Sequence, residues 1–387
     1  MTPPFQRPAL ELADVIERHG HRLDPQLSGE HRRILRAIAS CRTAAMGGHV
    51  ETCDCCHHQR IAYNSCRNRH CPKCQASACA RWMQEREAEL LPAEYFHVVF
   101  TLPDTFNALA LANKRVVYGV LFDAVSRTLL EIAADPKHLG AKIGFIAILH
   151  TWGQNLSLHP HVHCVVPGGG VSPDGSQWIS CKPGFFLPVR VLSKVFRGKF
   201  IDGLKKARKQ GKLVGVESDA AFARLLDASV KHDWVVYAKR PFGGPQQVLK
   251  YLSRYTHRIA ISNRRLVAMD DQTVTFKYKD YAQGSRPRTM TLDGKEFLRR
   301  FLLHAVPRGF MRIRHFGLLA NRGRAGNLAT CRKLLADKVP EVFTVVLTLT
   351  PPPELPRCPV CGKGRMVPGP HLSPMEIRKI ALRLDSS

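Results

Sequence analysis

The stretch SLHPHVHCVV (residues 157–166) decides how the central part of the chain folds. Successive side chains of a β-strand point to opposite faces, so a strand here places its three histidines on one face and the residues between them on the other. The histidines are His159, His161 and His163. A single histidine in a strand is usually satisfied by hydrogen bonds. Three imidazoles on one face are instead a candidate metal site.

The residues around this stretch predict a small α+β sheet with helices on one face. Apolar, aromatic and β-branched runs predict strands at 94–103, 142–150 and 159–167. The last two strands are joined by a short loop. Helical patterns are predicted at 108–134 and from Pro245 onward.

The charge of the chain points to a polyanionic partner. Lys and Arg number 58 against 31 Asp and Glu in 387 residues, a formal net charge of +27. This excess is larger than solubility requires, and it favours nucleic acid over a merely soluble surface or a membrane surface. No apolar run approaches the ~20 residues that span a bilayer, and MTPPFQRPALELADVIERHG at the start lacks a signal-peptide pattern. We therefore expect a cytosolic protein with no membrane partner.

The cysteines indicate metal chemistry, because a cytosolic chain seldom carries a disulfide framework. Two CxxC pairs occur in CDCCHHQRIAYNSCRNRHCPKCQ (residues 53–75). Two thiolates three residues apart fit one knuckle turn, and two knuckles complete a closed tetrahedral zinc site that stabilises the fold. The favoured ligands are Cys53, Cys56, Cys71 and Cys74. The alternative ligands nearby are Cys55, Cys66, His57, His58 and His70.

A further pair, Cys358 and Cys361 in CPVCGKG, resembles half of a zinc site. It follows LTPPPELPR, a Pro-rich stretch that is typical of a linker. Because no other cysteine lies close to this pair in sequence, the completing ligands stay open between His371 and Cys331. The sequence therefore predicts a small C-terminal module that is a candidate for a second zinc ion.

His161 and His163 flank a valine on the central strand. Two imidazoles and one further ligand leave coordination positions open on a divalent cation, as metal-assisted chemistry on a phosphate requires. The candidates for the third ligand are His150 at the end of the preceding strand, Gln154 in the connecting loop and the more exposed His159. Residues 150–170 contain no Asp or Glu, which favours a side-chain nucleophile over activated water.

A candidate nucleophile lies in KYLSRYTHR (residues 250–258). Tyr251 and Tyr255 are one helical turn apart, so both hydroxyls project from one face. Tyrosine is a competent covalent nucleophile, and a metal that polarises the phosphate compensates for its weak acidity. Such an aromatic pair is more often core packing, but this helix is too basic for a buried face. The basic residues predicted to contact DNA are Lys250, Arg254, His257 and Arg258.

Together these motifs resemble a known family. HPHVHCVVPGGG followed by YLSRYTHRIAISN is similar to the two-tyrosine HUH rolling-circle transposases of bacterial insertion sequences. YNSCRNRHCPKCQ is similar to their N-terminal transposase zinc-binding domain, and the resemblance covers roughly residues 30–320. It implies an α+β fold, namely an HUH endonuclease palm made of an antiparallel sheet with helices on its faces, preceded by a small helical and zinc-knuckle domain.

The resemblance also implies a mechanism. His161 and His163 would bind Mg²⁺ or Mn²⁺, and Tyr251 and Tyr255 would each attack a phosphodiester to leave a 5′-phosphotyrosine and a free 3′-OH. Two nucleophiles suit sequential cleavage and rejoining of donor and target strands; if one tyrosine acts, its basic neighbours favour Tyr255. The expected partners are single-stranded DNA at the element ends and target, and host replication proteins. The expected location is the bacterial cytoplasm, at the nucleoid.

We expect five segments in chain order. They are a helical segment (1–46), a zinc-binding domain (47–85), the HUH nuclease core (93–265), its basic DNA-binding part (266–350) and a Pro-rich linker with the CxxC tail (351–387). Two alternative functions stay open. A replication initiator or relaxase would use the same chemistry, although the chain lacks a Walker GxxxxGK[ST] motif. A zinc-containing DNA-binding regulator would use the histidines and tyrosines only as structural residues.

Overall fold

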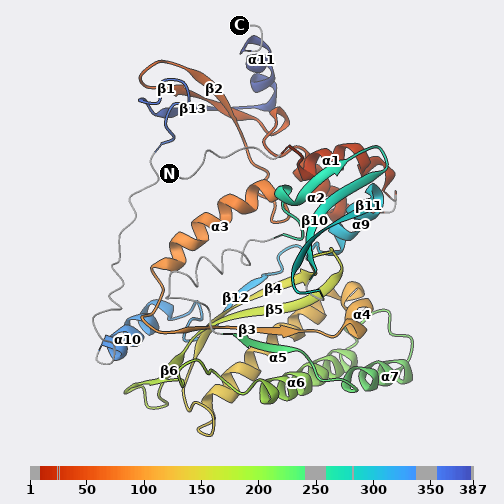
Figure 1. Cartoon of the computed structure of the whole chain (residues 1–387), viewed down its shortest axis with the longest axis vertical. Coiled ribbons are helices and arrows are strands. Elements are labelled where there is room, and N and C mark those ends of the chain that lie inside the picture. The colour runs from red at the N-terminus through yellow and green to blue at the C-terminus, as the bar shows by residue number, and fades with distance from the viewer. Residues whose placement is uncertain are drawn as a thin grey trace. The chain divides into compact units, whose positions relative to one another are not determined.

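The computed structural model describes residues 9–23, 25, 27–239, 259–280, 283–336 and 355–384. Its contacts divide the chain into two compact units, each built from segments that are distant in sequence (Figure 1). Unit 1 comprises Met1–Ala80, Ile261–Leu302 and Thr348–Ser387, and unit 2 comprises Arg81–Ala260 and Leu303–Leu347. None of the helices in these described ranges is long and apolar enough to cross a membrane.

Unit 2 is built on a five-stranded antiparallel sheet in the order β12-β4-β5-β3-β8. Its strands are β3 (Tyr95–Thr101), β4 (Gly144–Trp152), β5 (Leu158–Pro167), β8 (Val236–Lys239) and β12 (Ile313–Gly317). β4 and β5 form a hairpin, in which the Gly153 N–H donates to the Ser157 carbonyl at 2.9 Å. The predicted α+β class and the three predicted central strands are confirmed.

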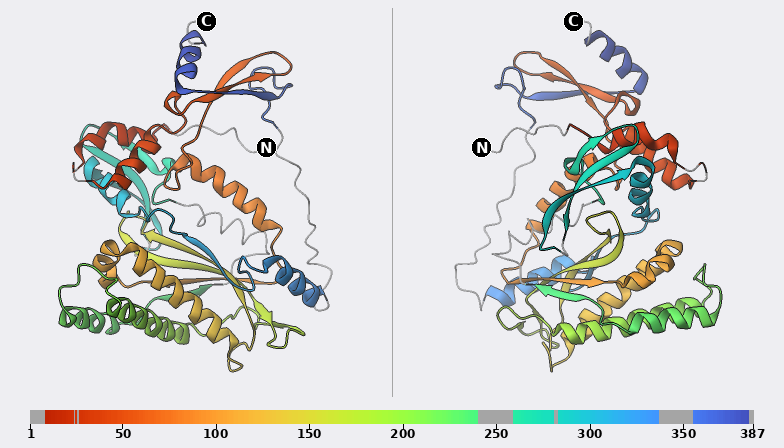
Figure 2. Two further views of the ribbon diagram at one scale, coloured as in Figure 1. Left: turned by 180° about the vertical axis from the view of Figure 1, so that it is seen from behind. Right: turned by 45° about the vertical axis from the view of Figure 1, so that its right-hand side comes forward.

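Helices cover one face of this sheet, as Figures 1 and 2 show for α5 and α6. The helices that begin in unit 2 are η3 (Asp104–Phe106), α4 (Asn107–Ala112), α5 (Lys114–Ala134), α6 (Val189–Lys209), α7 (Asp219–Val230) and α10 (Arg324–Ala336). A short hairpin of β6 (Gly169–Val171) and β7 (Trp178–Ser180) follows β5. The single helix predicted at 108–134 is two helices, because Asn113 leaves the helical conformation and its side chain donates to the carbonyls of Leu109 and Val214.

The alternation along β5 gives the sheet two different faces. Val162, Cys164 and Val166 lie in the large apolar core together with side chains of α5 and α6. The intervening residues point to the opposite face, where Val165 belongs to a separate, smaller cluster. The apolar face therefore holds the strand in place by burial, while the histidines lie on the face away from α5 and α6.

Unit 1 contains two three-stranded sheets, in the orders β13-β1-β2 and β11-β10-β9. The strands are β1 (Gly48–Cys53), β2 (Gln59–Tyr63), β9 (Leu266–Met269), β10 (Thr273–Asp280), β11 (Arg286–Asp293) and β13 (Met366–Leu372). The helices are α1 (Leu12–His19), η1 (Gly20–Arg22), α2 (Gly29–Ala39), η2 (Ala44–Met46), η4 (Asn263–Arg265), α9 (Gly294–Leu303) and α11 (Pro374–Leu384). α3 (Pro72–Glu87) begins in unit 1 and ends in unit 2.

The structure divides the chain differently from the predicted five segments. Residues 266–350 were expected to belong wholly to the nuclease core, whereas residues 261–302 group with the N-terminal helices. The start of α9 lies so close to α1 that a Cβ on Gly294 would come within 2.3 Å of the His19 ring. Arg22 also donates to the Asp293 carboxylate at 2.7 Å. These contacts between residues far apart in sequence are not visible in any local pattern.

Candidate functional site

Three histidine side chains come together on the β4–β5 hairpin. His150 lies directly opposite His161 in the antiparallel register, and His163 follows two residues further along β5. One ligand nitrogen from each ring lies within 4.8 Å of the others, and no carboxylate in the described part of the chain joins them. The ring centroids of His150 and His163 are 4.5 Å apart, and those of His161 and His163 are 4.8 Å apart. We call these three residues the histidine group.

Hydrogen bonds at Nδ1 orient two of these rings. His161 Nδ1 lies 2.6 Å from the carbonyl oxygen of His159, to which it can only donate. His163 Nδ1 lies 2.7 Å from Nε2 of His97, a buried residue of β3. A neutral imidazole that is protonated at Nδ1 offers Nε2 as its metal-binding atom, and ligand histidines are typically held in this way. His97 therefore helps to orient His163, although no sequence motif pointed to His97.

Burial keeps the imidazoles of His161 and His97 neutral at neutral pH. It lowers the pKa of His161 to about 4 and the pKa of His97 to about 4. Since only the neutral imidazole can bind a metal ion, His161 is in the required form at neutral pH. Trp152 stacks on His150 with 4.5 Å between the ring centroids, which restricts the orientation of the third ring.

The geometry separates the three candidates for the third ligand. His150 lies in the histidine group, while Gln154 lies in the turn between β4 and β5 and is not part of the group. His159 is exposed and is not part of it either. The remaining predicted site residues lie outside the described residues; they are Lys250, Tyr251, Arg254, Tyr255, His257 and Arg258.

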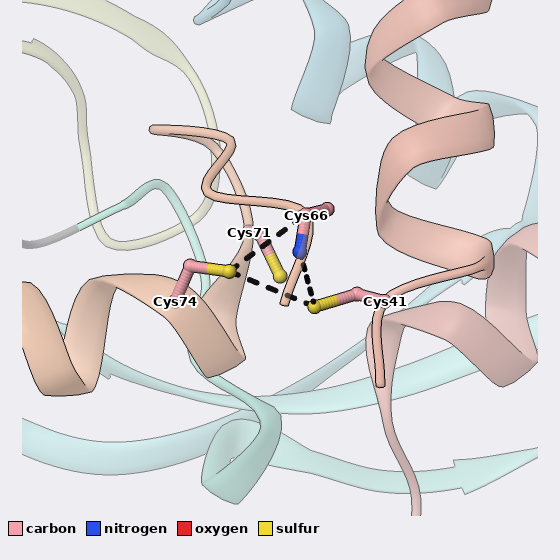
Figure 3. A group of neighbouring side chains, drawn as sticks. All are labelled: Cys41, Cys66, Cys71 and Cys74. Carbon is pink, nitrogen blue, oxygen red and sulfur yellow. Dashed lines mark hydrogen bonds between the residues drawn. The ribbon is translucent and has the colours of Figure 1, made fainter. Parts of the chain in front are cut away.

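The first cysteine group lies between α2 and α3 and consists of Cys41, Cys66, Cys71 and Cys74 (Figure 3). We call it the N-terminal cysteine group. The sulfur atom of Cys74 lies 3.6 Å from that of Cys41 and 3.6 Å from that of Cys66. Cys74 is placed by the first turn of α3, Cys41 follows the end of α2, and the other two come from the loop before α3.

The second cysteine group joins two distant parts of unit 1 and consists of Cys53, Cys56, Cys358 and Cys361. We call it the split cysteine group. The sulfur atoms of Cys53 and Cys361 are 3.7 Å apart, and those of Cys56 and Cys358 are 3.6 Å apart. Cys53 ends β1, Cys56 lies in the turn that follows, and the other two precede β13.

The predicted single zinc site of Cys53, Cys56, Cys71 and Cys74 is wrong in its grouping, because the two CxxC pairs belong to different groups. The physical reason is that a CxxC pair supplies half of a tetrahedral site and carries no information about the other half. The candidates His371 and Cys331 for the C-terminal pair are also wrong. Asn64 lies 2.8 Å from the His371 ring, and Cys331 is buried in the α10 cluster.

Two family models match ranges of the chain that contain these residues. A family model described as "Transposase zinc-binding domain" matches residues 13–102, a range that contains the whole N-terminal cysteine group. A second model, described as "Putative transposase", matches residues 144–326 and contains the histidine group. The two models together define the class of protein as a transposase with a zinc-binding domain.

The chain belongs to this family of insertion-sequence transposases. It is 55% identical over 375 residues to the putative transposase y4qJ of Sinorhizobium fredii, covering 92% of this chain and 94% of the relative. It is 28% identical over 320 residues to the transposase for insertion sequence element IS801 of Pseudomonas savastanoi pv. phaseolicola, covering 82% of this chain and 74% of the relative.

Solved structures of a conjugative relaxase, TrwC, also match. Its copper-bound complex with oriT DNA covers 62% of this chain and 70% of the relaxase chain, with 16% identity and a TM-score of 0.26. Its complex with a 27-mer DNA, comprising the recognition hairpin and the cleavage site, covers 62% and 72%, with 14% identity and a TM-score of 0.23.

Proposed function

We propose that this transposase cuts and rejoins single-stranded DNA through a cation held by the histidine group and a covalent bond to tyrosine. The observation that supports this proposal is the histidine group itself: three imidazoles on one face of a sheet, with no carboxylate in the group among the described residues. Three nitrogen ligands leave positions on a divalent cation for phosphate oxygens. Without a carboxylate base, a side-chain nucleophile is favoured over activated water.

The proposed nucleophiles are Tyr251 and Tyr255. The tyrosine oxygen attacks the phosphorus and loses its proton, the bond from phosphorus to the 3′ oxygen breaks, and that oxygen leaves as a 3′-OH. The 5′ phosphate stays bound to the tyrosine, so the energy of the broken bond is kept for rejoining. The basic neighbours Lys250, Arg254 and His257 would bind the DNA phosphates, and Arg258 would act with them.

The proposed cation is Mn²⁺ or Mg²⁺. Its role is to polarise the phosphate and to neutralise the charge that develops on it. Imidazole ligands suit transition metals better than they suit Mg²⁺, which prefers oxygen ligands. We therefore expect Mn²⁺ to support cleavage at lower concentration than Mg²⁺. The proposed substrates are the ends of a mobile element and its target, which places the reaction at the bacterial nucleoid.

The test is a search for the covalent intermediate. The protein is incubated with a labelled single-stranded oligonucleotide pool and Mn²⁺ or Mg²⁺, and the products are separated on a denaturing protein gel. We expect a metal-dependent protein–DNA band that is lost in the double variant Tyr251→Phe and Tyr255→Phe. The two single variants tell whether one tyrosine or both can act.

The matched control is Tyr237→Phe, because Tyr237 is a half-exposed tyrosine of β8 that lies outside the histidine group. Its covalent band should equal that of the unaltered protein. A band that persists in the double variant would reject these nucleophiles. Tight DNA binding without any covalent band would favour the regulator hypothesis instead.

A further inference from the structure

We propose that the split cysteine group is a second structural zinc centre, which fastens the C-terminal segment 355–384 to β1. The residues matched by the zinc-binding family model, 13–102, contain the whole of the N-terminal cysteine group. They contain only half of the split group, because Cys358 and Cys361 lie far beyond them. This inference does not depend on the proposed cleavage reaction.

The distances in the split group fit a tetrahedral zinc ion. Four sulfur atoms bound at about 2.3 Å to one zinc ion lie about 3.8 Å from each other. The sulfur atoms of Cys53 and Cys361 are 3.7 Å apart, and those of Cys56 and Cys358 are 3.6 Å apart. A disulfide would place two sulfur atoms about 2.0 Å apart, so neither pair is bonded. Four thiolates close the coordination sphere and leave no position for a substrate, which is the arrangement of a structural site.

Backbone amides of both half-sites point at the sulfur atoms. The N–H groups of Cys55 and Cys56 each donate to Cys53 Sγ at 3.4 Å. On the other half, the Gly364 N–H donates to Cys361 Sγ at 3.4 Å. Hydrogen bonds to an ionised acceptor are stronger than those to a neutral one. Each half-site therefore supplies donors that stabilise the thiolate form, which zinc binding requires.

The two half-sites also fit closely against each other through their backbones. A Cβ on Gly364 would lie 2.5 Å from Cys53 Sγ and 2.6 Å from Asp54 Oδ1, so only glycine fits there without a shift. The Arg365 N–H donates to the Asp54 carboxylate at 2.7 Å, and the Asp54 N–H donates to the Arg365 carbonyl at 3.1 Å. These contacts join residues that are 311 positions apart in the sequence.

The apolar cluster at the split group is small. Its buried members are Cys53, Cys358 and Met366, with Cys361 packed against them. β13 pairs with β1 from Met366 to Leu372, yet most side chains of β13 are exposed. A small module with so little apolar burial usually needs a metal ion to fold. Zinc bound by four thiolates would supply this stabilisation.

The test is the zinc content of the full-length protein, purified under reducing conditions and measured by elemental mass spectrometry. Every protein compared carries His163→Ala, so that zinc bound by the histidine group does not enter the count, and with all cysteines unaltered we expect two zinc ions per chain. The variant Cys358→Ser and Cys361→Ser should contain one, and so should the variant Cys53→Ser and Cys56→Ser. Combining all four changes should again leave one zinc ion, because both pairs serve the same site.

The matched control is Cys55→Ser, because Cys55 is an exposed cysteine between two proposed ligands and is not part of either group. It should keep both zinc ions. One zinc ion with all cysteines unaltered, or two in either double variant, would overturn the proposal. If the double variants do not accumulate, cobalt substitution of the unaltered protein decides: two cobalt ions with all-thiolate spectra support the proposal, and one overturns it.

A second variant tests the same centre without removing a ligand. Gly364→Ala forces a Cβ against Cys53, so the second zinc ion should be lost to a chelator several-fold faster than in the unaltered protein. Gly326→Ala is the control, because nothing lies within 4 Å of a Cβ at that position. Equal rates of zinc loss in both variants would contradict the close fit between the half-sites.

Discussion

The sheet that carries the histidine group and the ribbon that carries the split cysteine group are stabilised in different ways. The sheet of unit 2 is covered on one face by α5 and α6, and its apolar side chains fill a large core. The ribbon of β1, β2 and β13 has only a small cluster of buried cysteines and one methionine. We therefore expect the histidine group to be in place before a metal ion binds, and the ribbon to fold only when zinc is bound.

Removal of zinc should have the largest effect, and it tests whether the ribbon needs metal while the sheet does not. Structural zinc contributes roughly 10–16 kcal/mol in small peptides, comparable to the whole stability of a domain. After chelation, we expect amide protection in hydrogen–deuterium exchange to be lost in β1 and β13 and to persist in β4 and β5. Adding zinc back should restore it. Unchanged protection in β1 and β13 would show that the ribbon folds without metal.

Removal of one histidine ligand should greatly weaken metal binding without unfolding the sheet. In His163→Ala we expect Mn²⁺ affinity and covalent adduct formation to fall by more than about 100-fold. Removing a direct metal ligand weakens binding more than removing the residue that forms a hydrogen bond with that ligand, which typically costs 10–100-fold. The sheet should stay folded, which circular dichroism can check. His159→Ala is the control, since His159 is exposed and outside the group. Equal losses of Mn²⁺ affinity in both variants would show that His163 is not a metal ligand.

A smaller effect should follow from His97, which acts through His163. Loss of an outer hydrogen-bond partner typically costs 10–100-fold in metal affinity. We expect His97→Ala to weaken Mn²⁺ binding by about 10-fold or more, measured by electron paramagnetic resonance titration. His97→Gln should retain part of the affinity, because its amide oxygen can accept from His163 Nδ1. The same affinity in His97→Ala and the unaltered protein would show that the contact has no role in metal binding.

The last expected effect is a pH dependence of the stability of unit 2, similar in size to the effect of His97. Burial lowers the pKa of His304 from 6.5 to about 4, so the folded state keeps it neutral while the unfolded chain binds a proton below pH 6.5. Stability from this residue is complete above pH 6.5 and is lost as the pH falls toward 4. At pH 5 we expect His304 alone to contribute a loss of about 2 kcal/mol in the free energy of unfolding, in addition to the losses from His161 and His97.

The measurement compares denaturant unfolding of unit 2 at pH 7 and pH 5 in the unaltered protein and in His304→Gln. Glutamine does not titrate, so the variant should lose less stability between the two pH values. The cysteine groups are present in both proteins, and their own pH dependence cancels in the comparison. Identical losses would mean that another group carries the pH dependence.

Local patterns were enough to predict the sheet and the position of its histidines. The alternation along β5 placed His161 and His163 on one face, and the neighbouring apolar runs predicted β3 and β4. Local patterns could not select His150 over Gln154 or identify His97. Those choices depend on the register between strands, which aligns His150 with His161 and brings His97 within 2.7 Å of His163.

The sequence by itself determined that the chain is basic, that it binds zinc through cysteines and that one strand carries a histidine pair, because these follow from composition and short spacing. Tertiary structure alone decided which cysteines share a site. Cys53 and Cys361 are 308 residues apart, and Cys41, outside any CxxC pair, completes the N-terminal group. The spacing of a cysteine pair determines the positions of two ligands within one turn of the chain. Which other cysteines complete the site depends on how the backbone folds in space.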